Sequence, residues 1–281
     1  MGKFARSWAL AKASLEVLRS DKELLVFPLV SAIAVVLVAA SFILPMFGLG
    51  LFEQLEGSEG VPAGFYLWMF AFYLVQYFVM FFFNTALVGA AMIRLDGGDP
   101  TVVDGLRIAG GKWLQILGYA AIAATVGMIL RALEQRAGFL GRIVIGLIGV
   151  AWTVATFLTV PVLVVRDVGP VEAIKESATL LKSTWGENLI GNGGIGLALG
   201  LVNVGVVLLA VAVIGALASQ GLVTLGIAVG VVAVLVVLAL ALVQSALSGI
   251  YSAALYRFAV QGDAPVGFDG VLLRDAFQRK L

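Results

Sequence analysis

The 281-residue chain is 61% hydrophobic and only 12% charged, and its formal net charge is +1. Ordinary globular domains carry about 25% charged residues and about 45–50% apolar ones, so this excess of apolar side chains is expected to face lipid. The chain has no cysteine and no histidine. This excludes disulfides, zinc sites built from these residues and any mechanism that needs an imidazole base.

Six apolar stretches follow one another along the chain. Each is long enough to cross a hydrocarbon core of about 30 Å, which takes about 20 helical residues. They are residues 24–52, 63–93, 113–133, 143–165, 189–218 and 222–257. Because lipid offers no hydrogen bonds to the backbone, each stretch is expected to be helical. We therefore predict an all-α, polytopic membrane helix bundle with six transmembrane helices, forming a single membrane domain over residues 1–281.

The distribution of Lys and Arg predicts the orientation of this bundle. With the N-terminus in the cytoplasm, 15 of the 18 basic residues fall on the cytoplasmic side, and only Arg131, Arg136 and Arg142 fall outside. By the positive-inside rule this asymmetry indicates a multi-pass protein of the cell membrane. Both termini are predicted to be cytoplasmic, including a C-terminal tail over residues 258–281.

Amphipathic segments precede the apolar stretches on the predicted cytoplasmic side. Apolar residues recur at helical spacing near the N-terminus and again over residues 171–185, beside basic residues, and residues 101–112 are a weaker, glycine-broken version. Such helices are typical of the membrane interface, where basic residues attract anionic lipid. The predicted headgroup contacts are Trp8, Lys12, Arg19, Lys175, Lys182 and Trp185.

Two of these segments match each other in detail. Residues 12–20 align without gaps with residues 175–183, and the opening of the middle segment at Pro100 resembles the one at Pro170. We interpret the chain as three parallel units, each an interfacial helix followed by a transmembrane hairpin. Their predicted bounds are residues 1–93, 99–165 and 170–257. The alternative is that any basic interfacial helix before a span looks alike.

The stretches RLDGGDPTVVDGL (94–106), 123–165 and ALYRFAVQGDAPVGFDGVLLRDAF (254–277) together resemble an uncharacterised family of prokaryotic six-helix membrane proteins. The pattern Pro-x-x-Ala-x-x-x-Ser with a later Trp is also loosely similar to the membrane domain attached to some glycerophosphodiester phosphodiesterases. In that second comparison, catalysis belongs to a separate soluble domain. The resemblance therefore implies a fold and a membrane location, and it brings no catalytic residue.

No charged residue lies near the middle of a predicted span, which argues against proton relays and ion-coupled pumps. Uncharged polar residues do lie deep in the spans. Asn84 and Thr85 lie nearer the cytoplasmic end of the second span, and the residues of a possible polar bundle centre are Thr125, Thr153, Thr156, Asn203 and Gln244. Such side chains commonly make hydrogen bonds between helices, and the alternative is a polar-lined cavity.

Two further patterns have a structural and a functional interpretation. Residues 191–196 match a dinucleotide-binding glycine pattern, but they open an apolar span and follow no strand, so no nucleotide site is expected. The spacing of Gly196, Gly200, Gly226 and Gly230 predicts close helix packing instead.

The outer end of the third span carries Arg131 and Glu134 three residues apart. This spacing predicts a local ion pair on the helix surface, with anchoring at the interface. The alternative is a rim that binds an anionic headgroup.

These patterns favour a non-enzymatic membrane protein with a structural, scaffolding or lipid-interacting role, self-associating, with lipids as partners. No cofactor, metal, nucleotide or nucleic acid is expected. A channel or transporter for a small solute is the alternative. A lipid-modifying enzyme is a third hypothesis, which would depend on cytoplasmic carboxylates at Asp96, Asp99, Asp104 and Asp167.

Overall fold

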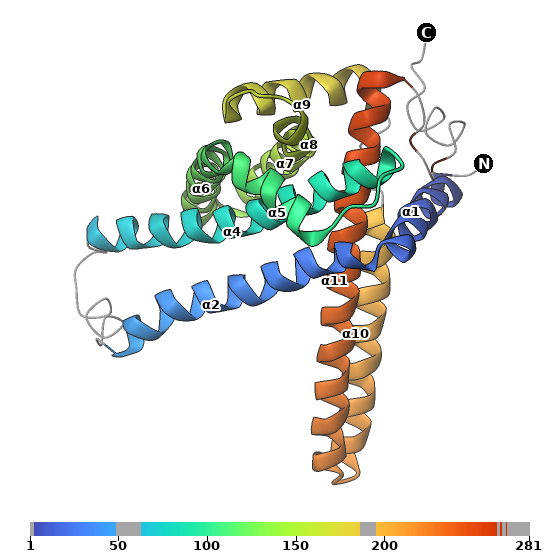
Figure 1. Ribbon diagram of the computed structural model, residues 1–281. Helices are drawn as coiled ribbons and strands as arrows, with labels where there is room; N and C mark the ends of the chain where they lie inside the picture. The colour runs from blue at the N-terminus through green and yellow to red at the C-terminus, as the bar shows by residue number, and fades with distance from the viewer. Residues whose placement is uncertain (1–2, 49–62, 186–194, 263–264, 266–267, 269–281) are drawn as a thin grey trace.

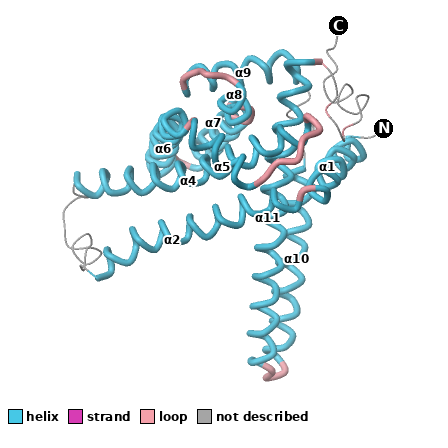
Figure 2. Tube along the Cα trace, viewed as in Figure 1, coloured by secondary structure: helices cyan, strands magenta, loops and turns pink. Residues whose placement is uncertain are grey.

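The computed structural model describes residues 3–48, 63–185, 195–262, 265 and 268. Every regular element among them is a helix (Figure 2). The elements are α1 (Lys3–Ser20), the 3-10 helix η1 (Lys22–Leu25), α2 (Val26–Gly48), α4 (Ala63–Leu95), α5 (Val102–Gly111), α6 (Trp113–Arg136), α7 (Phe139–Ala155), α8 (Thr159–Val165), α9 (Pro170–Trp185), α10 (Ile195–Ser219) and α11 (Val223–Gln261).

Six helical segments are long and apolar enough to cross a membrane. They are η1 with α2, α4, α6, α7 with α8, α10, and α11. This confirms the predicted all-α class and the six apolar spans. At a rise of 1.5 Å per residue, the 33 residues of α4 and the 39 residues of α11 extend about 50 and about 58 Å. Both exceed a hydrocarbon core of about 30 Å, so they must tilt or protrude.

The fourth span is broken, whereas the sequence predicts one continuous helix over residues 143–165. α7 ends at Ala155, and α8 begins at Thr159 with Pro161 in its first turn. Proline is tolerated there because the first amide groups of a helix have no partner within it. Ser177 of α9 completes the break: its hydroxyl donates to the Ala155 carbonyl at 2.7 Å and accepts from the Leu158 amide at 3.0 Å.

Spanning helices that are consecutive in the chain pack side by side: α2 on α4, α6 on α7, and α10 on α11. The helix that ends each pair of spans also contacts the other two such helices. These helices are α4, α11 and α8, which is the second part of the span that begins with α7. Away from this meeting point the pairs diverge. Figure 1 shows α2 and α4 running across the view while α10 and α11 run down it.

The three helices that are not part of a span, α1, α5 and α9, pack in the same way. α5 packs on α4 and α9 packs on α8, so each lies on the last helix of the preceding pair. α1 packs on α11 in the same way, which closes the ring between the two ends of the chain (Figure 1). The aligned residues also match in burial, because Ser14 and Ser177 are both fully buried, and Leu18 and Leu181 are each 4% exposed.

The packed core lies where all these helices meet, at the end of the molecule formed by α1, η1, α5, α8, α9 and the last residues of α4 and α11. We call this end the hub. Its fully buried side chains include Phe27, Leu87, Leu163, Ile250 and Leu255. The outer parts of the long helices instead expose large apolar side chains. The hub therefore positions six spans whose outer portions are free to face lipid.

Candidate binding cavity

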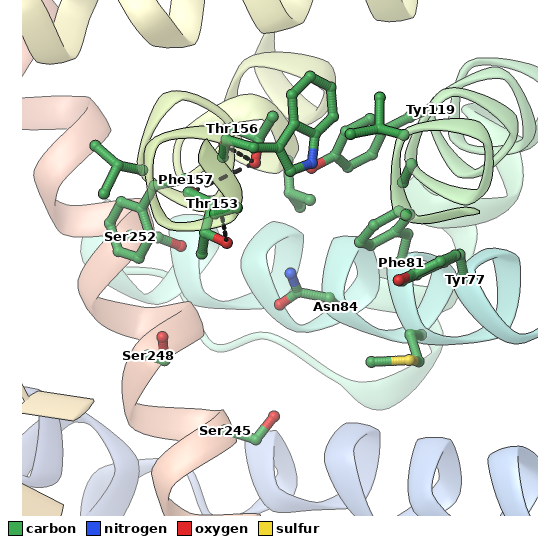
Figure 3. A pocket seen from close by; sticks show the side chains of 18 of the residues that line it. Tyr77, Phe81, Asn84, Tyr119, Thr153, Thr156, Phe157, Ser245, Ser248 and Ser252 are labelled. Atoms are coloured by element: carbon green, nitrogen blue, oxygen red, sulfur yellow. Dashed lines mark hydrogen bonds between the residues drawn. The ribbon is translucent and has the colours of Figure 1, made fainter. Parts of the chain in front are cut away.

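A cavity of about 1140 Å³ lies between the diverging helices, and its lining extends from the hub towards their outer ends as far as Leu130 and Gly146. Residues of α2, α4, α6, α7, α8 and α11 line it, and most of this lining is apolar. Its size is close to that of typical ligand pockets, which are mostly apolar with a few polar groups. Figure 3 shows the labelled side chains of α4, α6, α7 and α11 gathered around this space.

Aromatic rings form one wall of the cavity. Tyr77 stacks on Phe81 in α4 with ring centroids 5.7 Å apart, and Phe81 stacks on Tyr119 of α6 at 4.3 Å. The close approach of the two helices at this wall uses Gly127, where an added Cβ would lie 3.4 Å from the Tyr77 hydroxyl. The result is a continuous apolar surface from two helices that are not consecutive in the chain.

Uncharged polar groups form the floor. The hydroxyls of Thr153 in α7 and of Thr156, which directly follows α7, donate to the carbonyls of Gly149 and Trp152 at 3.0 and 2.9 Å. Their oxygens keep lone pairs that can accept a hydrogen bond. The amide of Asn84 points into the same space (Figure 3) and makes no hydrogen bond to another described residue. The floor can therefore both donate to and accept from an uncharged polar group.

The floor repeats around the three helices that meet in the hub. Asn84, Thr156 and Ser248 line the cavity, and an arginine follows each of them in the chain, ten, ten and nine residues later. Those arginines are Arg94, Arg166 and Arg257. The three helices that meet in the hub thus each have a small polar group on the cavity, within the helix in α4 and α11 and just before it in α8.

A packed apolar layer separates this floor from the charged groups of the hub. Leu87 lies between Asn84 and Arg94 in α4, and it is 1% exposed. Leu163 of α8 and Leu255 of α11 occupy the corresponding stretches and are fully buried. The cavity therefore ends against close-packed side chains on the hub side.

The arginines at the hub ends of the fourth span, α4 and α11 are paired with carboxylates. Arg94 lies 3.1 Å from Asp21, Arg166 lies 2.6 Å from Glu176, and Arg257 lies 2.5 Å from Asp96. Burial raises the pKa of Asp21 above its usual value, and the charge of Arg94 offsets part of that increase. These pairs join α4 to the loop before η1, α8 to α9, and α11 to the end of α4.

The four carboxylates considered for catalysis are all in structural contacts. Asp96 pairs with Arg257, Asp99 lies 3.9 Å from Arg94, and Asp167 lies 3.1 Å from Lys112. Asp104 closes a capping box with Thr101 at the start of α5, and its hydrogen bonds lower the pKa of its carboxyl. Within the part of the chain that the structure describes, no three acidic side chains form a group that could hold a metal ion.

The structure brings together most of the predicted polar centre. Thr153, Thr156 and Gln244 line the cavity, and Asn203 of α10 donates to the Gln244 side-chain oxygen at 3.4 Å. Thr125 lies apart from them, since its side chain is exposed and donates to the Ala121 carbonyl of its own helix.

The predicted headgroup residues lie on the hub. Lys12, Arg19, Lys175 and Lys182 are exposed on α1 and α9. The side chains of Trp8 and Trp185 lie outside the described residues.

The predicted packing glycines divide into two groups. Gly226 and Gly230 face Ile214 of α10 at ordinary contact distances, so they allow α10 and α11 to approach each other. An added Cβ at Gly200 would meet open space. The surroundings of Gly196 and most of the 191–196 glycine pattern lie outside the described residues.

Sequence analysis did not identify Tyr119 or the serines of α11 as cavity residues. Ser245, Ser248 and Ser252 lie at spacings of three and four, so they share one face of α11 and all line the cavity. That periodic polar stripe in an apolar span was a usable signal. Tyr119 had none, because its role depends on how α4 packs on α6.

The outer end of α6 differs from its prediction. Arg131 and Glu134 form no ion pair, and the guanidinium of Arg131 donates instead to the Tyr73 hydroxyl of α4. A helix surface allows an i, i+3 pair, but here a partner on the neighbouring helix takes its place.

Comparison with known proteins identifies one family. The model of DUF6159, described as a family of unknown function, matches residues 63–267. No curated protein and no solved structure matches the chain.

Proposed function

We propose that this chain, which belongs to the DUF6159 family of unknown function, is a non-enzymatic membrane protein that binds one amphipathic, lipid-like molecule between its diverging helices. The observation that carries this proposal is the cavity of about 1140 Å³, with an aromatic wall, an uncharged polar floor and a closed hub end. An apolar chain would lie on the wall of Tyr77, Phe81 and Tyr119. An uncharged polar part of the ligand would hydrogen-bond to Asn84 and Thr156.

The proposal includes an orientation. The hub would face the cytoplasm, with α1, α5 and α9 at the membrane interface. Three transmembrane hairpins would extend from it as parallel repeats. The exposed Lys and Arg of α1 and α9 support this orientation, since basic residues favour the cytoplasmic side and attract anionic lipid. The cyclic packing of α1, α5 and α9 supports the repeat. Self-association stays a prediction.

Binding fits this geometry better than conduction does. A channel needs a continuous path, and selectivity for ions needs charged rings or backbone carbonyls along it. Here the cavity ends at buried residues such as Leu87, Leu163 and Leu255, and its lining carries no charged side chain. The side open to the outer ends of the spans suits entry of a molecule from the lipid.

Filling the cavity tests the proposal. Gly146 and Gly149 line it, and an added Cβ at Gly146 would meet nothing within 4 Å, whereas one at Gly149 would make only an ordinary contact at 3.9 Å. The double change Gly146→Leu with Gly149→Leu, here called the filled variant, should therefore occupy part of the space without disturbing the packing. The probe is tritiated 1-hexadecanol, an uncharged single-chain amphiphile, measured by scintillation proximity on the purified protein in detergent.

We expect saturable binding to the parent protein that weakens by about tenfold or more in the filled variant, the loss of roughly 1.4 kcal/mol of contact energy. The matched control changes Gly205 and Gly215 to Leu, because both are exposed on α10 with open space around them. Equal binding by the parent and the filled variant, at equal melting temperature, would refute the cavity as the binding site.

A further inference from the structure

We infer that the ligand is an anionic amphiphile whose carboxylate or phosphate binds Arg131 at the outer mouth of the cavity. This inference rests on the proposed function, because it names the class of molecule that the same cavity holds. It also concerns a residue that the polar floor does not include.

Arg131 lies next to the outer limit of the cavity lining on α6. It directly follows Leu130 and lies one turn beyond Gly127, and both of those residues line the cavity. Its guanidinium donates to the hydroxyl of Tyr73, whose ring stacks on that of Tyr77 with centroids 6.4 Å apart. The cation is therefore held next to the outer end of the aromatic wall.

Arg131 differs from the hub arginines in having no carboxylate partner among the described residues. Arg94, Arg166 and Arg257 each have one within 3.1 Å. Glu134, on the next turn of the same helix, does not pair with Arg131 although the spacing would allow it. The Arg131 side chain is exposed, so its guanidinium is accessible to an anion at the outer end of these helices. A planar guanidinium also matches a carboxylate or phosphate with two parallel hydrogen bonds.

The wall leads from this cation to the floor. Tyr73, Tyr77 and Phe81 follow one another at spacings of four residues on α4, and each pair stacks. From Tyr73, which holds the cation, to Asn84 on the floor, eleven residues of helix extend about 16 Å. The order of anionic head, apolar chain and uncharged polar contact follows from this arrangement of side chains.

The test compares two probes of equal chain length that differ in charge. Tritiated hexadecanoate and tritiated 1-hexadecanol are titrated at about pH 8, where a carboxyl group is ionised, by scintillation proximity on the full chain in detergent. The variants are Arg131→Gln and Tyr73→Phe, and the matched controls are Arg136→Gln and Arg142→Gln. All three arginines are exposed at the same end of the molecule, and the controls differ from Arg131 in having no described hydrogen bond to Tyr73.

We expect Arg131→Gln to weaken hexadecanoate binding by about tenfold to a hundredfold, the range for a lost charge-assisted hydrogen bond. Hexadecanol binding should change little. Tyr73→Phe should give a smaller loss for hexadecanoate alone, because the guanidinium keeps its charge but loses its fixed position. The two control variants should bind both probes as the parent does.

Three other results overturn the inference. Equal binding of both probes with no effect of Arg131→Gln would leave the proposed cavity in place but remove its anionic site. Equal weakening of both probes by Arg131→Gln would make Arg131 a structural residue. Equal loss of hexadecanoate in the three arginine variants would indicate general attraction by surface charge. The proposed function fails separately, if the filled variant with Leu at positions 146 and 149 binds both probes normally.

Discussion

The hub and the outer half of the molecule are built from the same helices but packed in opposite ways. In α11, Leu255 is fully buried in the hub, whereas Leu235, twenty residues earlier, is 60% exposed. In α4, Leu87 is 1% exposed and Leu67 is 70% exposed. The hub also contains every ion pair found among the described residues, and the outer half contains the cavity.

The difference indicates where the stability of the fold resides. Lipid chains are as apolar as leucine, so helices in a membrane associate through close packing and polar contacts rather than through the hydrophobic effect. The hub has both kinds of contact, with glycine and alanine at helix crossings and carboxylates beside arginines. The outer half has few of either, so its helices can separate without weakening the hub.

The largest expected effect comes from truncating a leucine in each region of the same helix. Leu255→Ala should destabilise the protein by about 2–5 kcal/mol, because it leaves a cavity in close-packed surroundings. Leu235→Ala should change stability by less than about 0.5 kcal/mol, since its side chain already faces outwards. Thermal unfolding in detergent measures both, and equal losses would show that the two halves contribute alike.

A smaller effect is expected from adding one methyl group at a helix crossing. An added Cβ at Gly105 of α5 would lie 2.5 Å from the Phe27 ring and 2.6 Å from the Ala86 carbonyl oxygen. Gly105→Ala should therefore cost about 1–3 kcal/mol, because the backbone of α4 must shift. Gly110→Ala in the same helix, where the space is open, should be neutral or slightly stabilising. If the two variants have the same melting temperature, α5 does not pack on α4 as described.

The break in the fourth span links the two regions. Ser177→Ala would leave the buried amide of Leu158 without its partner, at a cost of about 1–3 kcal/mol. It should also weaken hexadecanol binding, since Thr156 and Phe157 lie in the break and line the cavity. Ser41→Ala serves as the control, because that exposed hydroxyl bonds only within α2. A loss of stability with unchanged binding would separate the hub from the cavity.

The smallest effect concerns pH. The pKa of Asp21 is raised above 3.8 in the folded state, so its protonated form is favoured there. Its contribution to stability is therefore complete at low pH and declines as pH rises through the raised pKa. Asp21→Asn removes this dependence, so the melting temperature of the variant relative to the parent should be more favourable at about pH 7.5 than at about pH 4.5. The opposite trend would mean that pairing with Arg94 outweighs burial.

The sequence predicts the spans well because length and hydropathy are properties of each stretch alone. The break at residues 156–158 was not predicted, since it depends on Pro161 together with Ser177 on another helix. Thr125 and Thr153 look alike in sequence as polar residues in apolar runs. Only the packing of α6, α7 and α11 determines that Thr153 faces the cavity and Thr125 does not.

The prediction for the outer end of α6 was wrong for the same reason, because the contact there depends on how helices pack. A local pattern predicts a local pair between Arg131 and Glu134, but the guanidinium is held by Tyr73, which is 58 residues away in the chain. Contacts between elements far apart in sequence are not encoded in the spacing of neighbours. The candidate site is composed mostly of such contacts, whereas the spans are not.

The contact of α1 with α10 and α11 has a consequence for the order of assembly. α1 precedes every other described helix in the chain, so it is synthesised first, yet the surface that buries Ser14 and Leu18 belongs to the last pair. Contacts between segments this far apart in the chain form slowly, and the chain emerges from the ribosome at about 5–20 residues per second. The apolar face of α1 therefore stays without its final packing partner during synthesis, until α10 and α11 have been made.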